Sequence, residues 1–142
     1  MISNAAQSEE MATVIELRMP SQAEWVRVAR LAVAGIASRL DFTIEEVEDL
    51  KLAVAEAYTN CIQHAVQSDE VRIACEVFPS RLTITVEDRG KGFDGQHAAK
   101  AGEEPTVGGL GVFLIRTLMD DVSYAVDPAV GTRLTMTKHI RK

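Results

Sequence analysis

The sequence carries little positive charge. Its 15 Lys and Arg residues are outnumbered by 21 Asp and Glu residues, so the formal net charge is −6. A protein that binds nucleic acid by neutralising phosphates needs a basic face, and this charge balance argues against that class of function. The balance is compatible with a protein partner or with a metal–nucleotide complex as the ligand.

Long hydrophobic runs are also missing. No apolar stretch approaches the roughly 20 residues that a membrane-spanning helix needs. The N-terminal stretch MISNAAQSEEMA has neither the basic region nor the apolar region of a signal peptide. We therefore expect a cytoplasmic protein that is not associated with a membrane.

Cysteine is scarce, with two residues in the chain, Cys61 and Cys75. Both lie in patterns that look buried, and the expected state is two reduced core thiols in a cytoplasmic protein. With so few soft ligands, a metal site built on thiolates is not expected.

Two common nucleotide-binding signatures do not occur in the sequence. There is no Walker pattern G-x-x-x-x-G-K-[ST] and no Rossmann G-x-G-x-x-G followed by an acid on a second strand. Neither of these classes of nucleotide site is therefore expected.

The length and composition that remain are those of a globular domain. The 142 residues are enough for one domain with a real core, and 46% of them are hydrophobic and 25% charged. No internal repeat or linker divides the chain. We expect residues 1–11 to be a disordered tail and residues 12–142 to form the domain.

Alternating apolar and polar residues predict strands in several segments. In the first of them Ile15, Leu17 and Met19 share one face. The later segments form two pairs, each separated by a turn, and both pairs are predicted as hairpins. The predicted strands are 13–19, 69–78, 81–87, 122–126 and 132–138.

Helical spacing of apolar residues predicts a first helix over residues 21–40, with Ser21 as its N-cap and Trp25 in the core. A second helix begins with Thr43 and Glu46 as a capping box and ends near Gln67. Its predicted core stripe is Val47, Leu50, Val54, Ala57, Cys61 and Ala65.

The segment 108–121 has three glycines among its first four residues and is predicted to become a third, short helix. The order of elements is then β-α-α-β-β-loop-α-β-β. This order predicts an α+β fold, a two-layer sandwich of a mixed, mainly antiparallel sheet with helices on one face.

Glu56 and Asn60 stand out on the second helix because neither is easily buried without partners. With His64 they form a stripe that lies away from the core stripe. A carboxylate and an amide oxygen one turn apart can share a hard cation such as Mg²⁺. A solvated outer face would explain the same spacing, and His64 is also explained as a partly buried residue with a local hydrogen bond.

Two glycine-containing stretches are further candidates for binding. Asp88 ends a predicted strand and is followed by glycines at alternate positions, where a backbone can approach a ligand closely. The stretch GGLG at residues 108–111 precedes an apolar helix, and free N–H groups at such a start can hold an anion. Each stretch taken alone is also explained as an ordinary Gly-rich turn or helix start.

The combination is far more specific than its members. Four motifs follow one another in the sequence: E-x-x-x-N, then D-x-G-x-G, then G-x-G at a helix start, and last Gly131-Thr132, which opens a final strand. The chain resembles the GHKL ATP-binding fold of histidine kinases, gyrase-type ATPases and related chaperones. Within that fold it is most similar to bacterial anti-sigma factors of the sigma-B and sporulation type that are also serine-protein kinases. The resemblance covers residues 12–139 and is carried by residues 37–65, 88–93, 108–122 and 131–139.

The resemblance implies a role for each matching residue. Asn60 corresponds to the asparagine that binds Mg²⁺, and Glu56 to the residue that accepts a proton from the attacking serine hydroxyl. Asp88 corresponds to the aspartate that binds the adenine amino group, supported by Thr132. Residues 94–107 correspond to a lid over the nucleotide, which would be ATP or ADP. The glycines that line this site are implied to be Gly90, Gly92, Gly109 and Gly111.

One position departs from the pattern. Some relatives have an arginine just before the final glycine cluster, placed to meet the γ-phosphate, and Val107 stands there in this chain. Lys91, Lys100 or Arg116 could supply the positive charge, or Mg²⁺ alone could suffice. The departure bears on the rate of transfer more than on nucleotide binding.

The function implied by the resemblance has two parts. The chain would form a homodimer that sequesters a sigma factor, and it would phosphorylate an anti-anti-sigma factor on serine, with ATP or ADP biasing the choice of partner. Three other functions remain open: a non-enzymatic binding module, a related switch kinase whose partner is not a sigma factor, and an isolated histidine-kinase-like ATP-binding domain. The absence of a preceding phospho-acceptor helix pair argues against the last of these.

Overall fold

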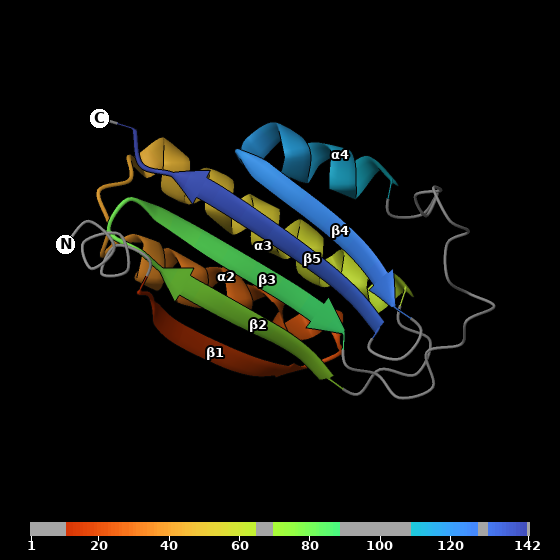
Figure 1. Cartoon of the computed structure of the whole chain (residues 1–142). Coiled ribbons are helices and arrows are strands. Elements are labelled where there is room, and N and C mark those ends of the chain that lie inside the picture. Colours follow the sequence, from red (N-terminus) through yellow and green to blue (C-terminus); the bar gives the residue numbers. More distant parts are fainter. Residues whose placement is uncertain (1–10, 65–69, 89–108, 128–130, 142) are drawn as a thin grey trace.

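A five-stranded antiparallel sheet covered on one face by helices forms the fold (Figure 1). The computed structural model describes residues 11–64, 70–88, 109–127 and 131–141. The strands are β1 (Thr13–Pro20), β2 (Glu70–Val77), β3 (Arg81–Asp88), β4 (Asp121–Asp127) and β5 (Gly131–His139). The helices are the short 3₁₀ helix η1 (Ala23–Trp25) and the α-helices α2 (Val26–Ala37), α3 (Ile44–His64) and α4 (Gly109–Leu118).

The strand order in the sheet is β1-β2-β3-β5-β4. Each of these four pairings is antiparallel, where a mixed sheet was expected. The reason is the connection through α4: it takes the chain past β3 to the outer strand β4, and β5 then returns between them, antiparallel to both. The predicted α+β sandwich and its five strands are otherwise confirmed, with strand ends that differ by at most one residue.

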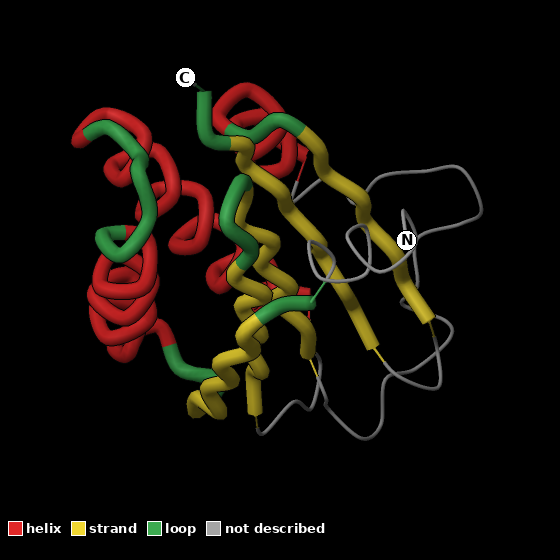
Figure 2. The backbone as a smooth tube through the Cα atoms, turned by 60° about the vertical axis from the view of Figure 1, so that its left-hand side comes forward, coloured by secondary structure: helices red, strands yellow, loops and turns green. Residues whose placement is uncertain are grey.

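Alternation along the strands directs one set of side chains to the helices. Ile73, Ile84, Leu134 and Met136 are all fully buried on that side. Figure 2 shows the helices together on this side of the sheet, and α3 lies at the centre of the layer, in contact with α2, α4 and three strands. The opposite face is polar: Thr83 and Thr137 make a hydroxyl pair at 3.0 Å between β3 and β5.

The predicted capping box at the start of α3 is confirmed. The Glu46 backbone N–H donates to Thr43 Oγ1 at 3.0 Å, and the Thr43 backbone N–H donates to Glu46 Oε1 at 2.8 Å. The core stripe is confirmed at Leu50, Val54 and Ala57, which are fully buried. The predicted helix end near Gln67 lies outside the described residues, which end at His64 in this helix.

The first predicted helix is shorter and rotated from its expected position. Ser21 does not cap it: η1 comes first, with Gln22 at its N-cap position and no side-chain capping bond. The extra 3₁₀ turn changes the helical phase, so the buried stripe of α2 is Ala29, Val33 and Ala37. Trp25, expected in the core, is 41% exposed.

Tyr58 joins the start of α2 to α3. Its buried hydroxyl donates to the Pro20 carbonyl oxygen, and the Gln22 carbonyl oxygen lies 3.3 Å away. Burial raises the pKa of Tyr58, and the hydrogen bond to Gln22 opposes that rise only in part. The connection between β1 and α2 is therefore fixed to the central helix.

No helix in the described part of the chain combines the length and the apolar character that crossing a membrane requires.

Candidate nucleotide site

Glu56 and Asn60 lie one turn apart on α3, the helix at the centre of the fold. Asn60 is 3% exposed, and its neighbours Ala57 and Cys61 are fully buried. Neither Oδ1 nor Nδ2 of Asn60 has a hydrogen-bond partner among the residues that the structure describes. Buried amides are nearly always paired, so an unpaired one in this position is typical of a site completed by a ligand.

The first turn of α4 lies against the Glu56 carboxylate. A Cβ atom placed on Gly111 would be 3.3 Å from Glu56 Oε2, closer than most side chains tolerate. Gly109 is the first residue of the helix. The N–H groups of a helix start have no partner within the helix and favour an anion. The structure thus places two of the four predicted site glycines in one turn, beside the predicted catalytic carboxylate.

Asp88 and Thr132 face the same side of neighbouring strands. Glu87 on β3 pairs with Arg133 on β5, so Asp88 and Thr132 are the next residues along their strands, toward the same end of the sheet. Both are 1% exposed. A buried carboxylate next to a buried hydroxyl at a strand end can accept a hydrogen bond from a ligand and hold it in one orientation.

Cys61 connects the two halves of the site. Its Sγ lies 3.8 Å from the Val86 carbonyl oxygen, which ties the Asn60 turn of α3 to the end of β3. The pKa of the Cys61 thiol is raised, first by complete burial and then by the negative charges of Asp88 and Glu87. The Asp88 carboxylate is therefore close to the turn of α3 that carries Asn60. The prediction that both cysteines are buried thiols is confirmed; burial also raises the pKa of Cys75, to about 11.

Several predicted residues are not brought into this group. Gly90, Gly92, Val107, Lys91 and Lys100 lie outside the described residues, as does the lid. Arg116 is exposed in the last turn of α4, at the opposite end of that helix from Gly109. Among the described side chains it is not placed to meet a phosphate at the helix start.

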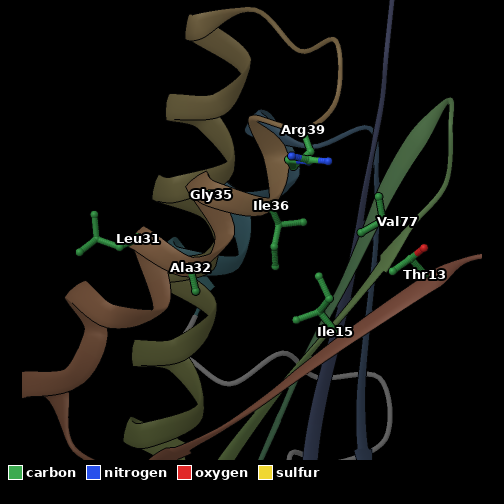
Figure 3. Close-up of a pocket in the computed structure, with 8 residues that line it drawn as sticks. All are labelled: Thr13, Ile15, Leu31, Ala32, Gly35, Ile36, Arg39 and Val77. Atoms are coloured by element: carbon green, nitrogen blue, oxygen red, sulfur yellow. The ribbon is translucent and has the colours of Figure 1, made fainter.

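An apolar groove between β1 and α2 is separate from these residues. It has a volume of about 450 Å³. Figure 3 shows Ile15 and Val77 of the strands facing Ile36 of the helix across it. None of the predicted site residues lines this groove.

Lys138 is a buried charged residue that the sequence reasoning missed, at the opposite end of β5 from Thr132. It is 8% exposed and lies on the helix-facing side of β5, in the same row as Leu134 and Met136. Its Nζ donates to the Leu118 carbonyl oxygen of α4 at 2.6 Å and lies 3.7 Å from Asp49 Oδ2 of α3. The signal in the sequence was a lysine at a core position of an alternating strand.

Comparisons with known proteins identify the family of this chain. Residues 19–138 match the family described as Histidine kinase-like ATPase domain. The chain is 40% identical to the Serine-protein kinase RsbW of Bacillus licheniformis, covering 92% of this chain and 88% of the relative. It is 41% identical to the protein of the same name from Bacillus subtilis, covering 91% and 87%.

The fold is also found in a solved structure. The crystal structure of the RsbU and RsbW domains of Rv1364c from Mycobacterium tuberculosis matches 92% of this chain and 33% of that chain, with a TM-score of 0.69 and 16% identity. At this identity the match supports the fold alone. The family match and the two relatives from Bacillus identify the chain: it belongs to the histidine kinase-like ATPase family and, within that family, to the RsbW group of serine-protein kinases.

Proposed function

We propose that this chain is an ATP-dependent protein-serine kinase that is also an anti-sigma factor. It sequesters an alternative sigma factor and phosphorylates that factor's anti-anti-sigma antagonist on serine. The observation that carries the proposal is the buried amide of Asn60, which has no hydrogen-bond partner among the described residues and lies one turn from Glu56, whose carboxylate lies against the start of α4. Family membership and the name of the relatives support the same activity.

Residues of the sheet, on β3 and β5, bind the adenine base. Asp88 accepts a hydrogen bond from the adenine amino group, and Thr132 supports it from the neighbouring strand. The support for these roles is that both side chains are buried on the helix-facing side of adjacent strands. Gly90 and Gly92 follow Asp88 in the sequence and allow the backbone to approach the base.

Residues of the helices α3 and α4 bind the phosphates. Gly109 and Gly111 place no side chain at two of the first three positions of α4, so the N–H groups there can donate to phosphate oxygens. The Asn60 amide oxygen is the type of ligand that Mg²⁺ prefers, together with phosphates and waters. When bound there, Mg²⁺ neutralises phosphate charge. The buried, unpaired state of Asn60 fits this role.

In the reaction, the serine oxygen of the antagonist forms a bond to the γ-phosphorus of ATP. The bond from that phosphorus to the bridging oxygen breaks, ADP leaves, and Glu56 accepts the hydroxyl proton. Most of the rate enhancement in phosphoryl transfer comes from positioning and charge stabilisation, which suits a site whose groups are fixed by a packed core.

The partners are proteins. The chain forms a homodimer that binds the sigma factor. The bound nucleotide, ATP or ADP, biases the choice between the sigma factor and the anti-anti-sigma antagonist. Binding of these two partners would take place in the cytoplasm. The net charge of −6 suits protein partners better than nucleic acid.

The test is incubation of the purified chain with labelled ATP, Mg²⁺ and the anti-anti-sigma protein. We expect acid-stable phosphoserine on that protein, and recovery of a sigma factor when the chain is pulled down from cells. Acid-labile phosphohistidine would instead support a histidine-kinase-like domain. Phosphoserine on a partner together with capture of a different regulator would support a switch kinase that does not act on sigma. No heat from ATP in calorimetry would refute the nucleotide site itself.

A further inference from the structure

Lys138 occupies a position where a cation requires partners. It belongs to the row of β5 side chains that face the helices, in which Leu134 and Met136 are fully buried. Lysine is rarely buried to this extent, because removing its charge from water is costly unless hydrogen bonds or an opposite charge replace the water. The roles proposed for Glu56, Asn60, Asp88 and Thr132 make no use of it.

The partners of Lys138 come from two different helices. Its Nζ donates to the Leu118 carbonyl oxygen, 2.6 Å away, at the end of α4. Carbonyl groups at a helix end have no partner within the helix and carry partial negative charge, so they suit a cation. The Asp49 carboxylate of α3 lies 3.7 Å from the same nitrogen. One side chain of the sheet therefore joins α3 to α4.

The contacts of Lys138 and the candidate site lie along the same faces of α3 and α4. On α3, Asp49 precedes Glu56 by seven residues, and on α4, Leu118 follows Gly111 by seven. Seven residues are about two helical turns, so each pair lies on one face of its helix, roughly 10 Å apart along the axis. The boundary between α3 and α4 thus has two points where polar groups lie, the Glu56 carboxylate against Gly111 at the site and Lys138 with its partners two turns away.

The end of α4 is fixed to β5 by further contacts. Asp120, just beyond the helix, accepts a hydrogen bond from the His139 backbone N–H at 2.7 Å and pairs with Arg141. The Asp120 backbone N–H donates to the Thr137 carbonyl oxygen at 2.9 Å. These contacts hold α4 to the sheet, whereas Lys138 also reaches α3.

Magnitudes indicate what this junction can do. An ion pair at 3.7 Å whose carboxylate side chain is 40% exposed contributes little to stability. In contrast, a displacement of about 1 Å at reacting groups can slow a reaction about 100-fold. The main consequence of the junction is therefore expected in the separation of the two helices, and so in where Glu56 lies relative to the start of α4.

We propose that Lys138 is a positioning residue for phosphoryl transfer, which sets the spacing of α3 and α4 through Asp49 and the Leu118 carbonyl and so places the Glu56 carboxylate. The inference depends on the proposed site, because it assumes that Glu56 receives the proton and that the start of α4 faces the phosphates. It assigns to β5 a role in catalysis in addition to the role of Thr132 in binding.

The test compares four single variants and the double variant Lys138→Met/Asp49→Asn with the wild-type chain in single-turnover transfer to the anti-anti-sigma protein, in ATP binding by calorimetry and in thermal unfolding. Lys138→Met removes the charge, and Asp49→Asn removes the carboxylate from a half-exposed position where the fold tolerates the change. Lys138→Arg keeps the charge and donors. Val33→Ala is the matched control, because it leaves a cavity in the core on α2, away from the α3–α4 boundary.

For Lys138→Met we expect transfer to slow by about 10- to 100-fold, with the ATP dissociation constant changed by less than about threefold. Asp49→Asn should slow transfer in the same sense, and the double variant should be no slower than Lys138→Met alone, because both act through one junction. Lys138→Arg should recover part of the rate. Val33→Ala should lower the unfolding temperature and leave the transfer rate of the folded protein unchanged.

Transfer at the wild-type rate by Lys138→Met or by Asp49→Asn would overturn the inference. The inference would also be overturned if the transfer rate fell in proportion to the unfolding temperature in every variant, Val33→Ala included. Failure of the proposed site is distinguishable, because then the wild-type chain itself would not bind ATP, or Glu56→Ala would transfer normally.

Discussion

At the scale of single residues, the site depends on polar groups held inside the core. Asn60 is 3% exposed between fully buried neighbours, and its amide has no partner among the described residues. Leaving a buried polar group unpaired costs about 1–3 kcal/mol. An alanine at this position would avoid that cost, so the asparagine is better explained by a ligand that provides the missing partner than by packing.

Glu56 gives the first prediction at this scale. Glu56→Ala removes the proposed proton acceptor and leaves the groups that bind nucleotide in place. We expect ATP affinity within about threefold of the wild type and transfer slower by at least about 100-fold, the usual contribution of a positioned base. Calorimetry and single-turnover transfer measure the two quantities.

The matched control is Glu48→Ala on the same helix, whose carboxylate is 59% exposed and pairs with Lys51. It should change neither quantity. If Glu56→Ala transfers at the wild-type rate, Glu56 is not the base.

Asp88 gives the second prediction. Asp88→Asn replaces the carboxylate that we propose accepts a hydrogen bond from the adenine amino group with an amide that can point a donor at it. We expect adenine nucleotides to bind about 10- to 100-fold more weakly, the effect of losing a hydrogen bond to a charged group. Binding of a triphosphate whose base lacks that amino group should be affected much less.

Glu87→Gln is the control for this variant, because Glu87 is the adjacent β3 residue but pairs with Arg133 on the other face of the sheet. It should leave ATP affinity within about threefold of the wild type. An equal loss for all nucleotides in Asp88→Asn would indicate misfolding and count against the assignment.

At the scale of secondary-structure elements, α3 is both the centre of the core and the carrier of Glu56 and Asn60, the proposed catalytic and Mg²⁺-binding residues. Its start is fixed by the reciprocal bonds of Thr43 and Glu46. Thr43→Ala removes one of them and should lower the free energy of unfolding by about 1 kcal/mol, as loss of an N-cap does. Urea unfolding measures the change.

Thr117→Ala on α4 is the matched control for the cap. The Thr117 hydroxyl donates to the Phe113 carbonyl oxygen one turn back, a bond that does not stabilise a helix, and alanine is the better helix former. This variant should be neutral or slightly more stable. An equal loss in both variants would mean that Thr43 contributes nothing as a cap.

The same scale shows what local patterns in the sequence can predict. The cap of α3 was predictable because it depends on residues three apart. The phase of α2 was not, because the chain enters it through η1 and the Tyr58 hydroxyl holds the preceding Pro20 carbonyl from 38 residues away. Trp25, expected inside, is therefore 41% exposed, and the small residues Ala29 and Ala37 face the core.

At the scale of the whole molecule, the candidate site is a product of topology. Glu56, Asp88 and Thr132 are far apart in the sequence, and spacing alone gave no reason for them to meet. Asp88 and Thr132 become neighbours because β5 inserts between β3 and β4, and α3, which carries Glu56, packs on both β3 and β5. The order of motifs could be matched to a known fold from the sequence, but the Lys138 junction could not, since it requires the positions of α3, α4 and β5 together.

Asp120 links the end of the chain to the rest of the fold and makes its stability depend on pH. Burial alone would raise the pKa of Asp120, but the His139 backbone N–H, Arg141 and Lys138 together outweigh it, so the pKa is lowered. A carboxyl whose pKa is lowered by folding stabilises the protein above its unfolded pKa, about 3.9 for aspartate, and loses that contribution as the pH falls through the folded value.

Asp120→Asn should therefore be less stable than the wild type by about 1 kcal/mol at pH 7, and the difference should shrink below about pH 4 as the wild-type carboxylate takes up a proton. Denaturant unfolding of both proteins from pH 7 to pH 3 measures it. Asp121→Asn is the control, since Asp121 is 74% exposed and its 3.4 Å contact with His139 should be worth less than about 0.5 kcal/mol. A difference between Asp120→Asn and the wild type that stays constant down to pH 3 would contradict the lowered pKa, because a side chain that acts through its shape alone does not respond to protons.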